Sequence, residues 1–360
     1  MTLPKTMTAM VTMGHGDLDQ MVLHKDWPRP DPAPGEVLIR VGACGLNNTD
    51  VNTRSGWYSK TVTDATTGGA FDEVGKDDPT WGGAPITFPR IQGADVCGEI
   101  VAVGEGVDPG RIGERVITDN WLRDPEDPTD INKTGYFGSE RDGGFAEYTT
   151  TPARNALAVR SELSDAELAT FSCSYSTAEG MLTRANVTSK DTVLVPGASG
   201  GVGGALVQLA KRRGARVIAM ASEAKQADVA ALGPDMILPR APENLRAALG
   251  DEKISVVADV VGGPYWPTLI DILERGGRYT CSGAIAGPMV DLDLRTLYLR
   301  DLTFTGSTVI PPEVMPNLIR YIERDEIKPL LAASYPLKKL RDAQAAFIAK
   351  THAGNIVVTP

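Results

Sequence analysis

The chain is poor in the side chains that bind metals or form disulfides: of its 360 residues, three are histidine and four are cysteine. The histidines lie in no cluster and in no metal-binding spacing. The cysteines form no CxxC pair, because they are widely separated as Cys44, Cys97, Cys173 and Cys281. We therefore expect neither a disulfide framework nor a structural zinc lobe, and interpret the cysteines as buried thiols in a reducing compartment.

Basic blocks and long apolar runs are also missing. The net charge is -10, and no stretch of Lys and Arg could neutralise a phosphate backbone or an anionic lipid surface. No segment approaches the roughly 18 apolar residues of a membrane-spanning helix, and the N-terminus lacks the features of a signal peptide. We expect a soluble, cytoplasmic protein that acts on a small molecule and has no nucleic-acid or membrane partner.

The composition that is present, 42% hydrophobic and 23% charged, is typical of globular proteins, and the length suits two domains. The first part is predicted to be β-rich, with strands over 36–41, 96–104 and 113–118 separated by glycines and by the proline-rich loop WPRPDPAPG. Two long polar segments, 59–90 and 123–141, interrupt it. Loops of this length are typically lids, binding loops or disordered segments.

From Ser164 onward the pattern changes to alternating strands and helices. Ser164 and Glu167 have the spacing of a capping box at a helix start. Strand-like runs then begin at 191, 215, 235, 254, 277 and 302, with helical runs between them, which predicts a parallel sheet covered on both faces. Helices over 312–327 and 340–351 and strands near 334–337 and 355–360 complete the chain.

The run VLVPGASGGVGGALVQLAKRRGARVIAM is a strand, a glycine-rich turn, a helix and a second strand, the context in which such glycines bind a dinucleotide. Backbone amides at the helix start would face the pyrophosphate, and the predicted residues are Ser199, Gly200, Gly201, Val202 and Gly203.

The residues after the second strand decide between the two nicotinamide cofactors. The sequence AMASEAK places Ala221 where NAD sites carry a carboxylate, whereas Ser222 and Lys225 suit a 2′-phosphate. Glu223 is an unfavourable charge at this place. NADPH is therefore predicted over NADH.

Several motifs together resemble the medium-chain dehydrogenase/reductase superfamily: PDPAPGEVLIRVGACGLN, PRIQGADVCGEIVAVGEGV, DGGFAEY, FSCSYSTAEGML, GASGGVG and GNIVVTP. The resemblance implies an α/β fold with a chaperonin-10-like β-rich catalytic domain over 1–163 and 308–360. It implies a doubly wound Rossmann domain over 164–307, with nicotinamide and substrate in the cleft between them. It further implies a homodimer formed through the edge strand LTFTGST, and cofactor contacts from Thr177, Arg240 and Gly283.

In this superfamily the alcohol dehydrogenases hold a catalytic zinc through a Cys, a His and a second Cys. The corresponding positions here are Asn47, Ala94 and Cys173, so only one ligand is kept. One thiolate cannot hold a four-coordinate zinc, and no catalytic metal is expected. Cys173 is interpreted as a small buried apolar group.

The stretch CGLNNTDVNTRSGWY resembles the zinc-independent quinone oxidoreductase and zeta-crystallin branch at Asn47, Asp50, Arg54, Gly56 and Tyr58. That resemblance implies hydride transfer from NADPH to a quinone or an α,β-unsaturated carbonyl. Asn47 and Tyr58 would donate hydrogen bonds to the substrate oxygen, and Thr49 matches the hydroxyl that relays protons in the zinc enzymes. Asp50 and Arg54 are interpreted as a pair that holds this loop.

Two other functions remain open, and so does the role of the first polar segment. The CSYSTA sequence around Cys173 favours an alcohol dehydrogenase or aldehyde reductase, and a non-catalytic NADPH-binding protein is the third possibility. Residues 59–90 follow Tyr58 directly and contain Phe71, Trp81 and Phe88. We interpret them as a lid over an apolar substrate.

Overall fold

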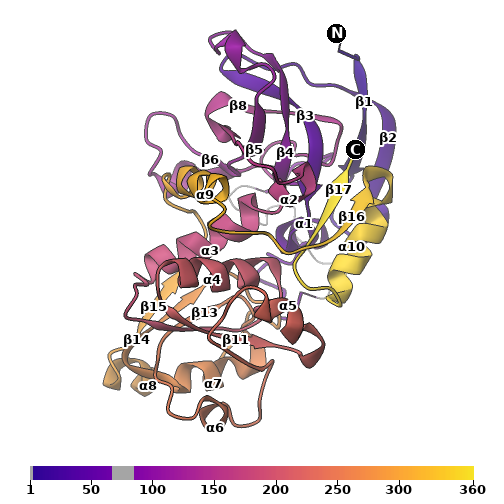
Figure 1. Ribbon diagram of the computed structural model, residues 1–360. Coiled ribbons are helices and arrows are strands. Elements are labelled where there is room, and N and C mark those ends of the chain that lie inside the picture. Colours follow the sequence, from indigo (N-terminus) through magenta and orange to yellow (C-terminus); the bar gives the residue numbers. More distant parts are fainter. Residues whose placement is uncertain (1–2, 67–84) are drawn as a thin grey trace.

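The computed structural model describes residues 3–66 and 85–360, which form two large sheets and two small ribbons with helices around and between them (Figure 1). Both chain ends lie in the same part of the molecule, at the first sheet, and the middle of the chain builds the second. The mixed α/β architecture predicted from the sequence is confirmed, whereas the domain boundaries at 163/164 and 307/308 stay predictions.

The first sheet combines strands from both ends of the chain. Its order is β16-β17-β3-β4-β5-β9, with β8 also pairing to β3. β17 runs antiparallel to β3, with Val358 opposite Cys44, so the C-terminus is fixed beside the segment that leads to Asn47. The strands are β3 (Glu36–Gly45), β4 (Asp95–Val103), β5 (Arg115–Thr118), β8 (Tyr148–Pro152), β9 (Ala156–Ala158), β16 (Leu331–Pro336) and β17 (Asn355–Thr359). Two small ribbons accompany it, formed by β1 (Thr6–Thr12) with β2 (Met21–Pro28) and by β6 (Trp121–Leu122) with β7 (Gly135–Tyr136).

The second sheet is parallel throughout, in the order β12-β11-β10-β13-β14-β15. The strand order reverses between β10 and β13, and in doubly wound folds ligands bind at the carboxyl ends of the strands at this point. The strands are β10 (Thr192–Val195), β11 (Arg216–Ala221), β12 (Met236–Pro239), β13 (Ile254–Asp259), β14 (Leu273–Cys281) and β15 (Thr303–Gly306).

The helices cover both sheets, and none in the described ranges is long and apolar enough to cross a membrane. They are α1 (Asn48–Ser55), α2 (Asp165–Leu168), α3 (Ser172–Arg184), α4 (Gly201–Arg212), α5 (Gln226–Ala230), α6 (Leu245–Leu249), α7 (Trp266–Asp271), α8 (Leu294–Leu299), α9 (Val314–Glu323) and α10 (Leu340–Ala349). The capping box predicted at the start of α2 is confirmed. The Ser164 amide donates to Glu167 Oε2 at 2.8 Å, and the Glu167 amide donates to Ser164 Oγ at 3.3 Å.

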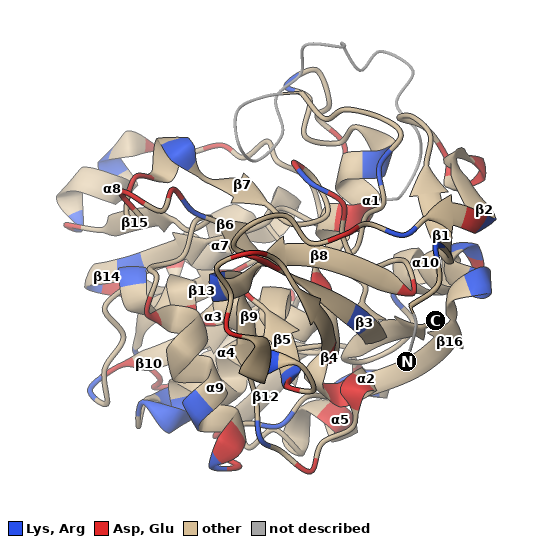
Figure 2. Ribbon diagram, turned by 90° about the horizontal axis from the view of Figure 1, so that it is seen from above, with Lys and Arg blue, Asp and Glu red and all other residues tan. Residues whose placement is uncertain are grey.

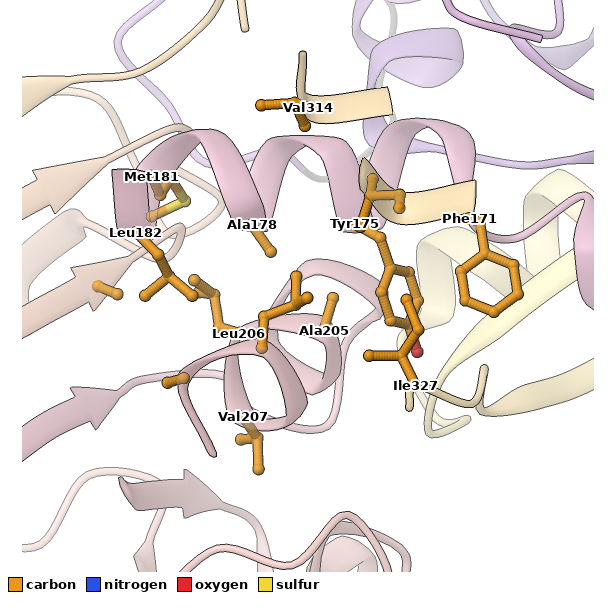
Figure 3. Close-up of a cluster of buried hydrophobic side chains, with 14 of the residues drawn as sticks. Phe171, Tyr175, Ala178, Met181, Leu182, Ala205, Leu206, Val207, Val314 and Ile327 are labelled. Carbon is orange, nitrogen blue, oxygen red and sulfur yellow. The ribbon is translucent and has the colours of Figure 1, made fainter. Parts of the chain in front are cut away.

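The largest core lies where α3 packs on α4, and side chains from α9 also join it (Figure 3). Tyr175, Ala178 and Leu182 point from α3 toward Ala205 and Leu206 of α4. These side chains are at most 1% exposed, so each contributes nearly the full free energy of burying its apolar surface. The α3–α4 contact therefore joins the CSYSTA segment rigidly to the glycine-rich turn. In the ribbon of Figure 2, acidic and basic residues are interspersed along the chain.

Candidate active site

A cleft between the two sheets brings together most of the residues predicted for catalysis and for the cofactor. Its walls come from the start and end of α1, from the β6–β7 ribbon, from α3, and from the loops after β10, β13 and β14. The polar groups that line it are side-chain amides, hydroxyls, indole N–H groups, one thiol and backbone groups. Among the described residues that line it, none is Asp, Glu, Lys, Arg or His.

Asn47 stands at the start of α1, where its position is fixed by the helix cap. The backbone amide of Asn47 donates to Asp50 Oδ2 at 2.8 Å, while Asp50 Oδ1 accepts from the Gly93 amide at 3.2 Å. Asp50 therefore acts as the capping carboxylate and does not pair with Arg54, which corrects the interpretation of these two residues as a pair. Arg54 is 0% exposed and instead donates to the Gly16 carbonyl at 2.5 Å and to Gln344 Oε1 at 3.2 Å.

A second buried carboxylate, Asp95, lies behind the cleft between the positions that would carry zinc ligands. Its Oδ1 accepts both from the Cys173 amide at 2.9 Å and from Asn120 Nδ2 at 2.8 Å. The Asn47 side chain faces the same carboxylate and stabilises its charged form. Asn120 Nδ2 also donates to the Tyr136 hydroxyl oxygen at 3.3 Å, which links Asp95 to the cleft wall.

The Cys173 thiol is part of this polar network, contrary to its interpretation as an isolated apolar group. The hydroxyls of Tyr136 and Thr177 interact with it and lower its pKa, but burial and the Asp95 charge raise that pKa by more. The thiol therefore keeps its proton at neutral pH. Ala94, which stands at the histidine position, is 1% exposed and has no ligand atom. In the described parts of the chain, no three His, Cys, Asp or Glu side chains are arranged to hold a metal ion.

The two buried carboxylates have unusually high proton affinities. Burial raises the pKa of Asp50 and of Asp95 to about 7, and the negative charge of Asp95 raises the pKa of Asp50 further. Tyr58 lies close enough to feel both the Asp50 charge and the Cys173 thiol, and burial raises its pKa well above the ordinary value of 10. The Tyr58 hydroxyl therefore remains a hydrogen-bond donor at any physiological pH.

The three residues predicted to be catalytic all line the cleft. Asn47 and Thr49 lie at the start of α1, and Tyr58 follows its end, where its hydroxyl interacts with the Asn52 side chain. The Thr49 hydroxyl is buried and has no hydrogen-bond partner among the described residues. The Asn47 side-chain nitrogen is likewise buried and has no hydrogen bond within ordinary distance and angle limits among the described residues, although it lies close enough to Asp95 to stabilise its charge. Both of its N–H groups are donors that an acceptor oxygen could use.

The predicted pyrophosphate loop opens into the same cleft. Gly197 has φ +65, a conformation that favours glycine, and a side chain on Gly203 would come within 2.2 Å of the Gly197 carbonyl oxygen. The amides at the start of α4 have no partner inside the helix and face the cleft, as anion binding requires. Gly200, Gly201, Val202 and Gly203 line the cleft, as do Thr177 and Gly283. Ser199 does not line the cleft, but its carbonyl accepts from the Gly354 amide at 2.7 Å.

Basic side chains gather at the carboxyl ends of β11 and β12, beside Ser222. Lys225 and Arg240 lie close enough that the Arg240 charge, after burial, lowers the pKa of Lys225. A third cation, Lys350, comes from the end of α10: its carbonyl accepts from Lys225 Nζ at 2.6 Å, and its own Nζ donates to Asn48 Oδ1 at 2.8 Å. Burial and the Lys225 charge lower the pKa of Lys350 to about 7. An anion bound here would stabilise the charged form of Lys350.

The described beginning of the polar segment 59–90 reaches across the cleft. The Thr66 amide donates to the Ile285 carbonyl at 3.0 Å, and Trp57 Nε1 donates to the Asp64 carbonyl at 2.9 Å. Phe71 and Trp81, offered as lid side chains, lie outside the described residues. Phe88 does not line the cleft but packs edge-on against His15, with ring centroids 4.9 Å apart.

Sequence reasoning missed four residues of this site. Asp95 lies inside the motif PRIQGADVCGEIVAVGEGV, which was used only for the family resemblance. Tyr136 lies within the polar segment 123–141 and Trp121 just before it, where no periodicity singles them out. Lys350 follows Lys225 by 125 positions. A Lys directly after a helix that precedes the last strand is the signal that could have found it.

The family described as the alcohol dehydrogenase GroES-like domain matches residues 33–161, and the family described as zinc-binding dehydrogenase matches residues 201–324. A protein from Sinorhizobium meliloti 1021, whose crystal structure is provisionally assigned to an alcohol dehydrogenase, is 47% identical in sequence to this chain. The two structures have a TM-score of 0.89, and the match covers 99% of this chain and 98% of that one. Acryloyl-coenzyme A reductase of Metallosphaera sedula is 27% identical over 98% of this chain and 100% of its own length. NADPH-dependent alkenal/one oxidoreductase of Arabidopsis thaliana, a chloroplast protein, is 26% identical over 100% of this chain and 81% of its own length. With a GroES-like domain, a Rossmann-type parallel sheet and a close relative over nearly its whole length, the chain belongs to the medium-chain dehydrogenase/reductase superfamily.

Proposed function

We propose that the protein is an NADPH-dependent, zinc-independent oxidoreductase that transfers hydride to a quinone or an α,β-unsaturated carbonyl. The observation that carries this proposal is the zinc position itself. There Asn47, Ala94 and Cys173 offer a single thiol, while Asn47 and Tyr58 supply uncharged hydrogen-bond donors beside the dinucleotide loop. The alkenal/one oxidoreductase relative supports the acceptor class.

The donors in the cleft suit an acceptor whose charge is delocalised. Bound NADPH supplies the hydride; the cleft residues hold the acceptor and stabilise the negative charge that develops on its oxygen. Tyr58 keeps its proton because burial raises its pKa, so it donates to that oxygen, and the Asn47 amide offers a second donor. Such donors are each worth about 2.7 to 4 kcal/mol in the transition state. Tyr58 or water then provides the proton that completes the reduction.

NADPH is proposed over NADH because three cations surround the place of a 2′-phosphate. Lys225, Arg240 and Lys350 come together there although they lie far apart in the sequence. We expect Lys350→Gln to weaken NADPH binding by about tenfold or more and to leave NADH binding within twofold, since a charge-assisted hydrogen bond contributes about 1.5 to 3 kcal/mol. Lys253→Gln, an exposed lysine at the opposite end of the strands, is the control. Fluorescence titration with both cofactors measures the two dissociation constants, and equal losses for both would contradict the assignment.

The test of the reaction is the oxidation of NADPH and NADH at 340 nm on chelator-treated protein, with a quinone, an enone and an aldehyde as acceptors. The proposal requires turnover of quinone or enone that prefers NADPH and survives chelation. Activity with aldehyde alone, lost on chelation and restored by zinc, would establish instead the alcohol dehydrogenase or aldehyde reductase function that Cys173 and the Sinorhizobium relative favour. Tight NADPH binding without turnover of any acceptor would identify a non-catalytic binding protein.

We also propose a homodimer formed by pairing of the edge strand β15 with that of a second copy. The helix α8 and the loop before it lead into this strand and carry five exposed apolar residues. Each is between 40% and 69% exposed: Met289, Val290, Leu294, Tyr298 and Leu299. An open strand edge beside exposed apolar side chains is typical of a subunit interface. Light scattering on wild type and on Leu294→Lys tests this proposal, which requires a dimer that the substitution dissociates.

A further inference from the structure

Two aromatic side chains that no prediction assigned form one wall of the cleft. Trp121 of β6 stands directly opposite Tyr136 of β7 in the antiparallel ribbon, and their ring centroids are 5.0 Å apart at an angle of 70°. Both side chains are 5% exposed and both line the cleft. Trp57 and Tyr58, from the end of α1, add a second edge-to-face pair with centroids 5.7 Å apart. Surfaces of this kind bind flat rings by stacking and edge contacts.

The Trp121–Tyr136 wall is held rigidly by hydrogen bonds on both sides. The Trp121 amide donates to Asp119 Oδ1 at 3.0 Å, and its carbonyl accepts from Asn155 Nδ2 at 2.9 Å. Across the ribbon, Asn120 Nδ2 donates to the Tyr136 hydroxyl oxygen. A wall fixed in advance loses little conformational entropy when a ligand binds, so its shape can discriminate between acceptors.

The charge distribution around the cleft disfavours an anionic acceptor. None of the described residues that line the cleft carries a cation or an anion. Behind the lining, the carboxylate of Asp95 contacts the Cys173 amide and that of Asp50 contacts the Asn47 amide. Lys350 also lies behind the lining, where its Nζ donates to Asn48 Oδ1, among the cations proposed for the 2′-phosphate. A carboxylate of the acceptor that enters the cleft would leave water and meet no cation in the lining, and Asp50 and Asp95 would repel it where they are ionised.

We infer that the acceptor is an uncharged molecule with a planar ring conjugated to its reducible group, and that the Trp121–Tyr136 wall is the specificity determinant that selects the ring. This inference rests on the proposed hydride transfer to conjugated acceptors and narrows it. The wall sets the affinity for the ring, whereas Asn47 and Tyr58 act on the acceptor oxygen. Ring preference and turnover can therefore be separated by mutation.

Three matched enones test the inference with NADPH: 4-phenyl-3-buten-2-one, its para-carboxylate derivative, and 3-penten-2-one, which has the same reducible group without a ring. We expect kcat/KM to be at least about tenfold higher for the neutral ring enone than for 3-penten-2-one. The para-carboxylate should be poorer by about a hundredfold or more, because its charge would leave water without meeting a cation in the cleft lining. Equal kcat/KM values for the ring and ring-free enones, or for the neutral and carboxylate ones, would overturn the inference while leaving the proposed function intact. Turnover of none of these enones and of no quinone would instead overturn the proposed function.

A pair of tryptophan variants assigns the ring preference to the wall. Trp121→Phe should reduce the ratio of kcat/KM between the ring and ring-free enones by about threefold or more, and Trp121→Ala should nearly abolish it. Trp266→Phe is the matched control, since Trp266 is also 5% exposed but lies in a separate core away from the cleft. Because the ratio is measured within one variant, a loss of folded protein lowers both values and leaves the ratio unchanged. Tyr136→Phe keeps the ring and should keep the preference. An unchanged ratio in Trp121→Ala would refute the role of the wall.

Discussion

Asp95 offers a test of the electrostatics behind the cleft, because an isosteric substitution can remove its charge and keep its hydrogen bonds. The Cys173 amide and Asn120 Nδ2 both donate to the same oxygen, Oδ1. In Asp95→Asn the amide oxygen can take that place, and the new amide nitrogen faces Asn47, whose side chain can turn its oxygen toward it. We therefore expect Asp95→Asn to stabilise the protein at alkaline pH.

The expected gain in the free energy of unfolding follows from the pKa of Asp95, which burial raises from the ordinary value of 3.8 to about 7. Below pH 4 the carboxyl is protonated in both the folded and the unfolded chain and has no effect on the free energy of unfolding. Between pH 4 and 7 only the folded chain keeps the proton, so the free energy of unfolding falls as the pH rises. At about 1.4 kcal/mol for each pH unit, the cost at pH 8 is on the order of 4 kcal/mol.

Urea unfolding at pH 5 and pH 8 measures this difference. The free energy of unfolding of Asp95→Asn should exceed that of wild type by several kcal/mol at pH 8 and by much less at pH 5. Asp50→Asn is the matched comparison: its two oxygens accept from two different amides, of Asn47 and Gly93, so one bond is lost and the gain should be smaller or absent. If Asp95→Asn were no more stable than wild type at pH 8, or showed the same pH dependence, the reasoning would be refuted.

Three further predictions concern catalysis and stability. Tyr58→Phe should lower kcat for the enone by about 10²- to 10³-fold with NADPH affinity unchanged, as steady-state kinetics and cofactor titration would show. Gly201→Ala should destabilise the protein by about 1 to 3 kcal/mol, since its Cβ would lie 2.3 Å from Asn355 Oδ1. Gly200→Ala, whose Cβ would meet only a carbonyl oxygen at 3.6 Å, should be nearly neutral in the same thermal unfolding assay without cofactor. Arg54→Met should lower the free energy of unfolding by about 2 to 4 kcal/mol, because it leaves the Gly16 carbonyl and the Gln344 side chain without their donor. An unchanged urea unfolding curve would contradict this prediction.

The fold was predictable because its signals are local. The parallel sheet follows from alternating apolar strands and helices, the start of α2 from the spacing of Ser164 and Glu167, and the dinucleotide loop from glycines between a strand and a helix. The family resemblance implied only that both ends of the chain share one domain, and the pairing of β17 with β3 was not predicted. Nothing in the local sequence of Asn355–Thr359 specifies a partner more than 300 positions away.

The site was predictable only where its residues lie in continuous motifs. Asn47, Thr49 and Tyr58 share one helix and its ends, and the sequence places them together. The expected pair of Asp50 and Arg54 was wrong because spacing along a helix does not reveal competing partners: the amides of Asn47 and Gly93 bind Asp50, and Gly16 and Gln344 bind Arg54. Lys350 and the Trp121–Tyr136 wall depend on tertiary contacts and could not be found from periodicity.

The residues at the positions of the family's zinc ligands give a physical reason for the activated acceptor that we propose. With Asn47 and Ala94 at two of the ligand positions, a zinc-independent cleft would lack the cation that stabilises an oxygen anion, while Asp95 lies behind them as a buried carboxyl group. Because the pKa of Asp95 is about 7, its ionised form above that pH opposes the build-up of negative charge on a nearby acceptor, and the uncharged donors of Asn47 and Tyr58 act against this repulsion. An acceptor that spreads the charge over a conjugated system reduces both the repulsion and the need for a Lewis acid. The acceptor class proposed for this cleft is thus the one whose reduction least needs a metal ion.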